Sequence, residues 1–385
     1  MKIYLDHNAT TPIDPKVFSA MLPYLQWEYG NPSSIHHWGR QAKVALSQAR
    51  CQVAGLIKAE PEEIFFTGGG TEADSWAVQG VIKAIPKLPA DKHIITTQIE
   101  HPAILKTCRY LEDEGVRVTY LPLDQYGRIS LDNLEAAISD KTVLISVMLG
   151  NNEIGTLQPI ARIGELAQKR GICFHCDAVQ AAGKMPVSVK ELGVNLLSLS
   201  AHKMYGPKGV GALYIQTGTA IKPLIYGGGQ ERDLRSGTEN VAGVVGFGAA
   251  CQLAQEELPQ RQAGLEKLSA FLWEQIQSQI NEVHLNGHPQ ERLPGTLNLS
   301  FERVLAEDLL LNLDLEGIAV SGGAACKSGA HQYSLVLQAM KLPAERLHSA
   351  IRISLGKDNT EEETRHFVRT LKTILKRLRA GMACR

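Results

Sequence analysis

The sequence predicts an α/β protein with a large, mainly parallel sheet and a second, smaller domain. Over the first two-thirds of the 385 residues, short apolar runs rich in branched side chains alternate with longer amphipathic stretches. This is the pattern of strands joined by helices. Several apolar runs lack polar–apolar alternation, as expected of strands that helices cover on both faces. From about residue 255 a charged, Gln-rich helical stretch leads to a new set of strands.

The expected elements follow one another along the chain. The strands of the large sheet are expected at 63–66, 93–97, 116–121, 142–149, 172–176, 195–200 and 210–215. The run 241–251 (VAGVVGFGAAC) is too short to cross a bilayer and is rich in Gly and Ala, which predicts a closely packed core helix. Strands at 296–300 and 351–355 belong to the second domain. A last helix begins after Thr360, which has the capping-box spacing to Glu363.

Length and charge narrow the class of protein. We expect an N-terminal segment over 1–15 that packs with the small domain, a large domain over 16–255 and a small domain over 256–385. Forty Lys and Arg balance forty Asp and Glu, so no net charge favours nucleic acid or an anionic membrane. Asp6 and His7 interrupt the N-terminus before any apolar run, which argues against a secretory signal and for a cytoplasmic protein.

The cysteines predict reduced thiols. Seven of them, an odd number, are scattered along the chain, which argues against a disulfide framework. Cys173 and Cys176 have a C-x-x-C spacing, which can indicate redox chemistry or half of a zinc site. In a strand, however, residues three apart point to opposite faces, which favours two packed thiols and no metal site. Cys326 differs, because it lies in SGGAACKSG with little to pack against.

Polar residues follow several of the strands, at the end of an α/β sheet where ligands bind. Strand 63–66 leads into GGGT, where glycines let backbone N–H groups reach an anion at a helix N-terminus and the Thr71 hydroxyl adds a bond. A plain turn with Thr71 as N-cap explains this motif as well. For His101, after 93–97, a capping or surface role is the simpler interpretation. Asn151 and Asn152, after 142–149, can simply build a turn.

Two strand ends carry opposite charges. Asp177 ends a strand expected to be buried, so its carboxylate needs a cationic partner. Lys203 follows the strand 195–200, and a lysine near the buried end of a sheet has a lowered pKa and can act as a nucleophile. A phosphate cradle, a buried carboxylate and a buried lysine together fit pyridoxal phosphate (PLP), whose ring nitrogen the carboxylate keeps protonated. Gln180 is placed to reach the ring hydroxyl, and His101 to lie on the ring face or move protons.

The segment IRISLG adds a candidate for substrate binding. Ile351, Ile353 and Leu355 alternate with Arg352, so the arginine points away from the apolar layer. Its fork of donors suits a carboxylate, which an amino acid substrate would supply. From this segment alone, an arginine on the surface of a strand is an equal alternative.

Eleven segments in order resemble the cysteine desulfurases, which are PLP enzymes of the aspartate aminotransferase fold in the class V aminotransferase group. They are LDHNATT, GNPSS, GGGTEAD, EHPA, NNEIGT, DAVQ, SAHKMYGPKGVG, GGGQE, RSGTENV, SGGAACKSG and IRISLG. Together they cover nearly the whole chain, which makes the resemblance far more specific than any single motif. The resemblance therefore implies a PLP-dependent transferase fold, with a large mainly parallel-sheet domain and a smaller α+β domain.

The resemblance also implies roles for matching residues. Lys203 corresponds to the lysine that bonds to the cofactor and moves the Cα proton, Asp177 to the partner of the pyridine nitrogen, and Gln180 to the contact of the ring oxygen. His101 corresponds to the histidine that stacks on the ring. The matched phosphate ligands are Gly70, Thr71, Ser200 and His202, and the matched carboxylate-binding residues are Asn152, Arg352 and, as a further candidate, Asn8.

Two more positions imply partners. Thr238 resembles the residue that reaches the phosphate of the partner subunit, which implies a homodimer with two shared sites. Cys326 matches the cysteine that accepts sulfur as a persulfide. The chain departs from the family pattern at His7, where a second Asn is expected, and at Ala324 and Lys327, where Ser and Thr are common. Lys327 is expected to favour the Cys326 thiolate.

The resemblance thus implies a cysteine desulfurase that converts L-cysteine to L-alanine. Its sulfur would pass to a sulfur-accepting protein, such as an iron–sulfur scaffold, for cluster or thio-cofactor assembly. A selenocysteine lyase, a cysteine β-lyase or an aminotransferase on the same scaffold are the alternatives. A nucleotide-binding or thiol-redox protein built on GGGT and C-x-x-C is disfavoured, because the spacing matches neither a Walker loop nor a dinucleotide fingerprint.

Overall fold

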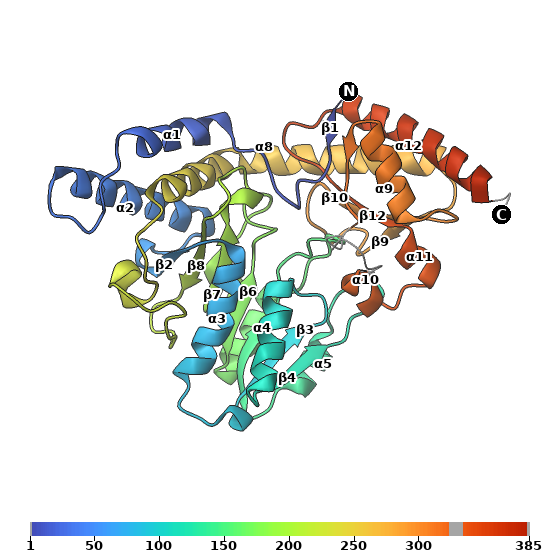
Figure 1. The fold of residues 1–385 in the computed structure, drawn as a ribbon. Helices are drawn as coiled ribbons and strands as arrows, with labels where there is room; N and C mark the ends of the chain where they lie inside the picture. The colour runs from blue at the N-terminus through green and yellow to red at the C-terminus, as the bar shows by residue number, and fades with distance from the viewer. Residues whose placement is uncertain (1, 323–333, 383–385) are drawn as a thin grey trace.

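The computed structural model describes residues 2–322 and 334–382, and its centre is a seven-stranded sheet (Figure 1). The strands are β2 (Ile64–Thr67), β3 (His93–Thr97), β4 (Arg117–Leu121), β5 (Thr142–Ser146), β6 (Cys173–Asp177), β7 (Leu196–Ser200) and β8 (Gly211–Ile215). Their spatial order is β2-β8-β7-β6-β5-β3-β4. Only β8 runs antiparallel to its neighbours, β2 and β7. All seven predicted strands are present, and the sheet is mainly parallel as predicted.

Helices cover both faces of this sheet. They are α1 (Pro15–Gln26), α2 (His37–Ile57), α3 (Gly70–Ala84), α4 (Pro102–Asp113), α5 (Leu131–Ala137), α6 (Ile160–Arg170) and α7 (Val189–Leu192), with 3₁₀ turns η1 (Pro61–Glu63), η2 (Pro89–Asp91), η3 (Ala201–Lys203) and η4 (Gln230–Asp233). Ile94 and Ile95, neighbours in β3, belong to different hydrophobic clusters, one with Trp76 of α3 and the other with Phe247 of the long helix α8 (Val241–Gln279). Because both faces are buried, the strands need no polar side.

The two cysteines of the C-x-x-C motif lie on opposite faces of the large sheet, because side chains alternate between the faces along a strand. Cys176 lies in the hydrophobic cluster on one face of the sheet, and Cys173 packs against the cluster on the other face. Both residues are free thiols. The interpretation as two separately packed thiols is therefore confirmed.

A single long helix, α8 (Val241–Gln279), runs along the molecule from α2 to α12 (Figure 1). Its first part packs closely, as predicted for 241–251, because a Cβ at Gly248 would lie 2.6 Å from Ala49 Cα of α2. Ala254 belongs to the cluster under the large sheet, and Leu265 to a second cluster. The expected boundary near residue 255 falls inside this helix. The change in amino-acid composition there therefore reflects a change in which cluster the helix packs against. The division into domains stays a prediction.

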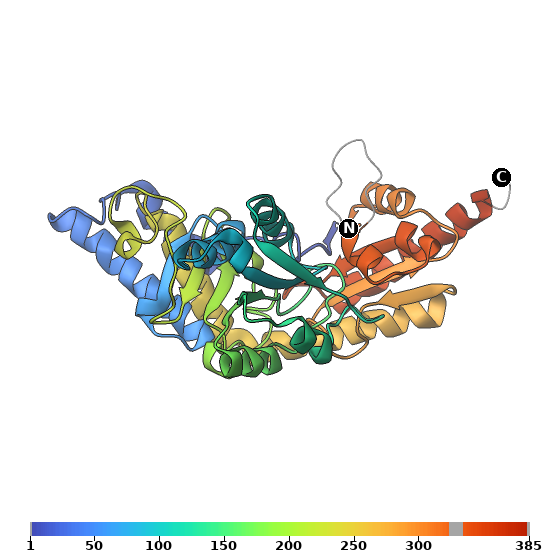
Figure 2. The ribbon, with the colours of Figure 1, turned by 90° about the horizontal axis from the view of Figure 1, so that it is seen from below.

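The second cluster is built by the C-terminal part and the N-terminus. A three-stranded antiparallel sheet has the order β12 (Ala350–Ser354), β10 (Thr296–Phe301) and β9 (Val283–Asn286). Around it lie α9 (Ala306–Leu315), α10 (Leu335–Ala339), α11 (Ala344–His348) and α12 (Glu361–Met382), and β1 (Ile3–Tyr4) pairs with β11 (Ile318–Ala319). Figure 2 shows these elements at one end of the molecule and α1 and α2 at the other. Ile3 and Leu5 join this cluster, so the N-terminus connects the two parts.

The predicted cap of the last helix is present. Glu363 N–H donates to Thr360 Oγ1 at 3.2 Å, and Thr360 N–H donates to Glu363 Oε2 at 3.0 Å. These reciprocal bonds form the capping box that begins α12. Within residues 2–322 and 334–382, no helix combines the length and the apolar content that crossing a membrane requires.

Candidate active site

A cavity of about 1040 Å³ lies where the large sheet, the N-terminal segment and the small sheet meet. The predicted site residues that line it are Asn8, Gly70, Thr71, His101, Asn152, Asp177, Gln180, Ser200, His202, Lys203 and Arg352. Thr238 is exposed and is not part of this lining. Cys326, like Ala324 and Lys327, lies outside the described residues.

The glycine turn brings the N-terminus of α3 to the cavity. Gly69 is the N-cap residue, with φ of 150°, and no side-chain cap is present among the described residues. The alternative that Thr71 is the N-cap is therefore wrong, because the helix already begins at Gly70. A Cβ at Gly70 would lie 2.9 Å from Val179 Cγ2, so the backbone approach needs glycine. The first N–H groups of a helix have no acceptor within it, and here they border the cavity.

Asp177 and His101 line the same cavity from two strand ends. Asp177 is 6% exposed, and its Oδ1 accepts a bond from Val179 N–H at 2.9 Å. Burial raises its pKa, while His101 and Lys203 act in the opposite direction. In the described part of the chain no ion pair involves Asp177, so the cationic partner that the sequence predicts for this carboxylate is not found among those residues. His101 is the N-cap of α4, accepting from Ala103 N–H at 3.1 Å, so the capping interpretation and the cavity position both hold.

A second buried carboxyl group, Asp74, lies beside Asp177 and also lines the cavity. Burial raises its pKa well above the usual range, and the Asp177 charge adds to this. Asp74 Oδ1 is 3.7 Å from Nε2 of His175, and burial lowers the histidine pKa to about 3, so the imidazole is neutral at neutral pH. The sequence did not predict this group, although an acidic residue one helical turn after Thr71 was a visible signal.

Lys203 lies in η3, directly after β7. Its Nζ donates to the carbonyl oxygens of Asn8 at 2.6 Å and Ala9 at 2.7 Å. Burial lowers the pKa of Lys203 to about 8, and the Arg352 charge adds to the lowering. The lowered lysine pKa expected from the sequence is confirmed, and a substantial fraction of the amine is therefore neutral near physiological pH.

Arg352 lies on β12 and is only 4% exposed. One guanidinium nitrogen is 2.6 Å from Asp6 Oδ1, and another donates to the Asn152 carbonyl at 3.1 Å. Its Nε has no partner among the described residues. The alternative of a surface arginine is wrong, because the N-terminal segment crosses over this strand. Asp6 was not expected at the site, since only the fold brings it there.

Asn151 and Asn152 have different roles. Asn151 Oδ1 accepts from the N–H groups of Glu153 at 2.9 Å and Ile154 at 3.0 Å. Asn151 therefore builds the turn, as the simpler interpretation held. Asn152 lines the cavity, and its carbonyl also accepts from Asn8 Nδ2 at 3.2 Å.

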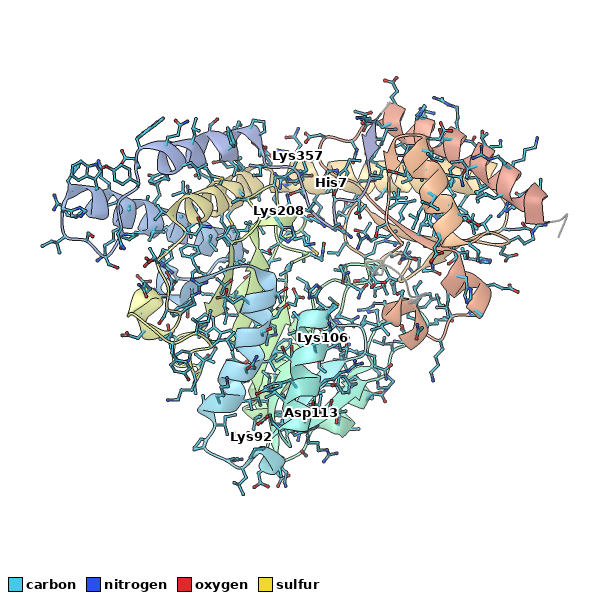
Figure 3. The ribbon with its side chains drawn as sticks, viewed as in Figure 1. His7, Lys92, Lys106, Asp113, Lys208 and Lys357 are labelled. Carbon is cyan, nitrogen blue, oxygen red and sulfur yellow. The ribbon has the colours of Figure 1, made fainter. Side chains whose placement is uncertain are left out.

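The N-terminal segment carries His7 to the middle of the molecule, below α8 in Figure 3. His7 is 6% exposed. The centroid of its ring lies 4.9 Å from the centroid of the Tyr4 ring and 6.1 Å from that of the Tyr205 ring. Burial lowers the pKa of His7 to about 4, and the nearby Lys184 adds to this. At the position where the family pattern has Asn, this chain therefore has a neutral imidazole, which is packed next to the site.

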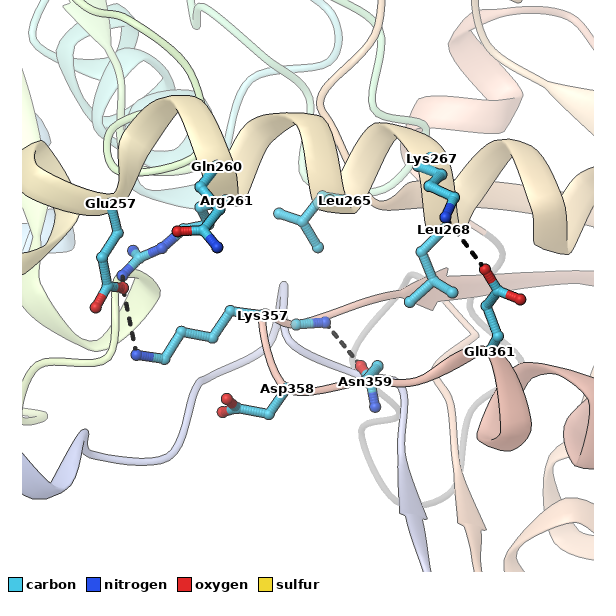
Figure 4. A pocket seen from close by; sticks show the side chains of 12 residues that line it. Glu257, Gln260, Arg261, Leu265, Lys267, Leu268, Lys357, Asp358, Asn359 and Glu361 are labelled. Atoms are coloured by element: carbon cyan, nitrogen blue, oxygen red, sulfur yellow. Dashed lines mark hydrogen bonds and ion pairs between the residues drawn. The ribbon is translucent and has the colours of Figure 1, made fainter.

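A second pocket, of about 450 Å³, lies between α8 and the start of α12 (Figure 4). Its cations are already paired with carboxylates: Arg261 with Glu257 at 2.7 Å, and Lys267 with Glu361 at 3.5 Å. Lys357 contacts Glu257 and Asp14. Each of these three cations therefore already has a carboxylate partner within 4 Å. Over the described ranges, no cluster of His, Cys, Asp and Glu suits a metal ion.

Comparison with known proteins decides the family. Residues 3–367 match the family model of class V aminotransferases. The chain belongs to the class V aminotransferase family. A cysteine desulfurase IscS from Dictyoglomus turgidum is 47% identical over 378 residues, which are 98% of this chain and 95% of that protein.

Solved structures of this family share the fold. The structure of a NifS-like protein has a TM-score of 0.92 at 40% identity, covering 98% of this chain and 100% of that one. The structure of SspA in complex with cysteine has a TM-score of 0.82 at 36% identity, covering 94% and 100%. The predicted PLP-dependent transferase fold is confirmed.

Class V aminotransferases of this kind depend on PLP, and the cavity suits that group. The uncapped N-terminus of α3 provides donors for a phosphate. Asp177 is a buried carboxyl without an ion-pair partner in the described chain, as a pyridine N–H requires. Lys203 provides an amine of lowered pKa. The residues present therefore fit the cofactor that the family uses.

Proposed function

We propose that this cavity is the site at which the enzyme, a PLP-dependent cysteine desulfurase, takes sulfur from L-cysteine. The observation that carries the proposal is the meeting of Lys203, Asp177 and Arg352 around one cavity. They supply an amine of lowered pKa, a carboxyl for a ring nitrogen and a guanidinium for a substrate carboxylate. When bound, PLP withdraws electrons from the Cα of an amino acid substrate.

The chain's own residues bind and orient the reactants. Arg352 donates to the cysteine carboxylate, since its Nε is buried without a described partner, and Asn152 and Asn8 complete the carboxylate site. Lys203 moves the Cα proton, because its neutral form is populated near pH 7. His101 covers the ring face. The phosphate is held by Gly70, Thr71, Ser200 and His202.

Cys326 accepts the sulfur in this proposal. The carbon–sulfur bond of the substrate breaks and a sulfur–sulfur bond forms, so that cysteine and a thiol become alanine and a persulfide. Four described cysteines are poor candidates, because burial raises the thiol pKa of Cys108, Cys173, Cys176 and Cys251. Cys51 is exposed on α2 and does not line the cavity. Ser321, five positions before Cys326, does line it.

We also propose that the enzyme is a homodimer. Thr238 is exposed and outside the lining of its own cavity, as expected of a residue that reaches the phosphate of a partner subunit. Large apolar side chains are exposed on and around α1 and α2: Phe18, Leu25, Trp27, Tyr29, Ile35, Trp38 and Val44. A second copy of the chain would cover such a surface. Sedimentation of the holoenzyme as a monomer would contradict this.

Three expectations complete the proposal. The persulfide passes its sulfur to a protein that assembles iron–sulfur clusters or thio-cofactors. The enzyme works in the cytoplasm. Its domains are 1–15, 16–255 and 256–385. Two separate hydrophobic clusters support this division: the first is built mainly by residues before 255, with Leu293, and the second by residues after it, with Ile3 and Leu5.

The deciding experiment measures alanine and protein persulfide formed from L-cysteine by wild type and Cys326→Ala with PLP. Wild type is expected to form both, and Cys326→Ala neither, while the cofactor absorbance is kept. If the variant formed as much alanine as wild type, Cys326 would not be the acceptor. If wild type released pyruvate or sulfide without alanine, or acted only on L-selenocysteine, a lyase would replace the desulfurase.

A further inference from the structure

Lys184 is a buried lysine to which the reaction described above assigns no role. It follows β6, is 7% exposed and is not part of the cavity lining. Its Nζ donates to Asn8 Oδ1 at 2.7 Å and to Gln180 Oε1 at 3.2 Å. Both acceptors are side-chain amides of residues that line the cavity. Lys184 therefore lies outside the lining of the cofactor site and contacts it through these two amides.

No carboxylate explains the position of Lys184. Within residues 2–322 and 334–382, none lies at ion-pair distance from its Nζ. The charged or titratable groups that act on it or beside it are Lys203 after β7, Arg352 on β12 and His7 in the N-terminal segment. Burial lowers the pKa of Lys184 to about 7, and Lys203 and Arg352 add to this. A lysine in such surroundings costs stability, and what it gains is the pair of bonds to amide oxygens.

These bonds fix which way two amides point, together with carbonyl oxygens that accept from Asn8 Nδ2 and Gln180 Nε2. An amide side chain presents oxygen or nitrogen with nearly equal ease, but an amine hydrogen can only be donated. Lys184 therefore holds both amides with their oxygens toward it. Gln180 Nε2 is then a donor, and one bond goes to the Asn8 carbonyl at 3.0 Å. That carbonyl is also the acceptor for Lys203 Nζ, so one network joins Lys184, Gln180 and Lys203.

We propose that Lys184 is a positioning residue for the cofactor ring: it locks the Gln180 amide with its nitrogen donor facing the ring oxygen. Without Lys184 only the bond to the Asn8 carbonyl still orients the amide. If the amide turned, its oxygen would meet the ring oxygen, which repels a second acceptor. This inference rests on the cofactor site proposed above, with Gln180 at the ring oxygen.

The test measures the PLP dissociation constant of the apo full-length protein by titration, together with its thermal unfolding. Lys184→Met keeps the length of the side chain and removes the donor. We expect its dissociation constant for PLP to rise about tenfold to hundredfold, as for a lost buried hydrogen bond, while the apo protein unfolds no earlier than wild type. The control is Lys190→Met on α7, an exposed lysine, which should bind PLP like wild type.

A double-mutant cycle separates positioning from general stability. In a Gln180→Met background the added Lys184→Met change is expected to leave the PLP dissociation constant unaltered, because the amide that Lys184 orients is gone. A structural role would instead lower apo stability and give additive losses of PLP affinity. Unchanged PLP affinity of Lys184→Met, or additivity in the cycle, would overturn the proposal.

If Lys184→Met does not fold, a second variant, Lys184→Gln, can still test the proposal. Lys184→Gln retains an uncharged donor, and its PLP dissociation constant should stay within a few-fold of the wild-type value. A loss as large as that of Gln180→Met would contradict the proposal. If wild type bound no PLP, the proposed cofactor site itself would be wrong, and the inference would fall with it.

Discussion

The imidazole of His7 occupies the space in which a side chain at position 356 would lie. A Cβ built on Gly356 would be 2.3 Å from His7 Cε1 and 2.5 Å from Nδ1. His7 cannot easily move, since its ring also meets Tyr4 and Tyr205. The histidine that departs from the family pattern is thus accommodated by a glycine that begins the turn into α12.

Gly356→Ala is expected to lower the free energy of unfolding by about 1–3 kcal/mol, because the added methyl overlaps the His7 ring. Urea unfolding measures this. The smaller side chain of His7→Asn should restore part of the loss in the double variant. Gly264→Ala on α8 is the control: its Cβ would meet nothing within 4 Å, so alanine should leave stability equal or higher. Equal losses for both variants would contradict the packing argument.

Reconstitution of the apo protein with PLP should become faster as pH rises through about 8. Burial and the Arg352 charge lower the pKa of Lys203 to about 8, and only the neutral amine is nucleophilic. Absorbance of the bound cofactor against time, at pH 6 to 10, gives the rates. Lys203→Ala should show no such absorbance. A midpoint near the usual lysine pKa, above 10, would show that Lys203 is not perturbed.

Glu100→Gln should gain stability relative to wild type as pH rises. Burial raises the pKa of Glu100 to about 8, and Thr97 Oγ1 donates to its Oε1 at 2.7 Å. Below its unfolded pKa the folded carboxyl contributes its full stability, which is lost as pH rises through the folded pKa. The difference between variant and wild type should therefore grow, by up to about 1.4 kcal/mol per pH unit, between about 4.5 and 8.

Urea unfolding of both proteins across this pH range tests the Glu100 prediction. The control is Glu135→Gln, an exposed residue paired with Arg170 at the surface, whose effect should be small. A stability difference for Glu100→Gln that does not change with pH would mean that the buried carboxyl does not titrate in this window.

Arg352→Lys should raise KM for L-cysteine about tenfold or more and change kcat much less. Lysine keeps the charge but loses the planar fork that holds a carboxylate at two points. Steady-state alanine formation gives both constants, and Arg170→Lys, an exposed arginine, is the control. A fall in kcat with unchanged KM would instead indicate that Arg352 acts by holding Asp6 and the N-terminal segment.

The local pattern was sufficient for many of these features. The strand 93–97 and the residues after it were predictable, because β-branched runs and the turns that follow them are properties of neighbouring residues. Lys203 and Asp177 could be placed at the site since each directly follows or ends a strand of a parallel sheet. Asp74 and Lys184 were missed, because the residues next to a charged side chain in the sequence do not indicate which distant groups it contacts.

By itself, then, the sequence determined the strands of the large sheet, the cap of the last helix and the polar residues at the strand ends, because these follow from side-chain periodicity and backbone preference over a few residues. Only the tertiary structure decided that β8 is antiparallel, that α8 continues through residue 255, and that Asp6 meets Arg352, 346 positions away. Contacts of this kind depend on how distant segments pack together, and no local pattern records the partner.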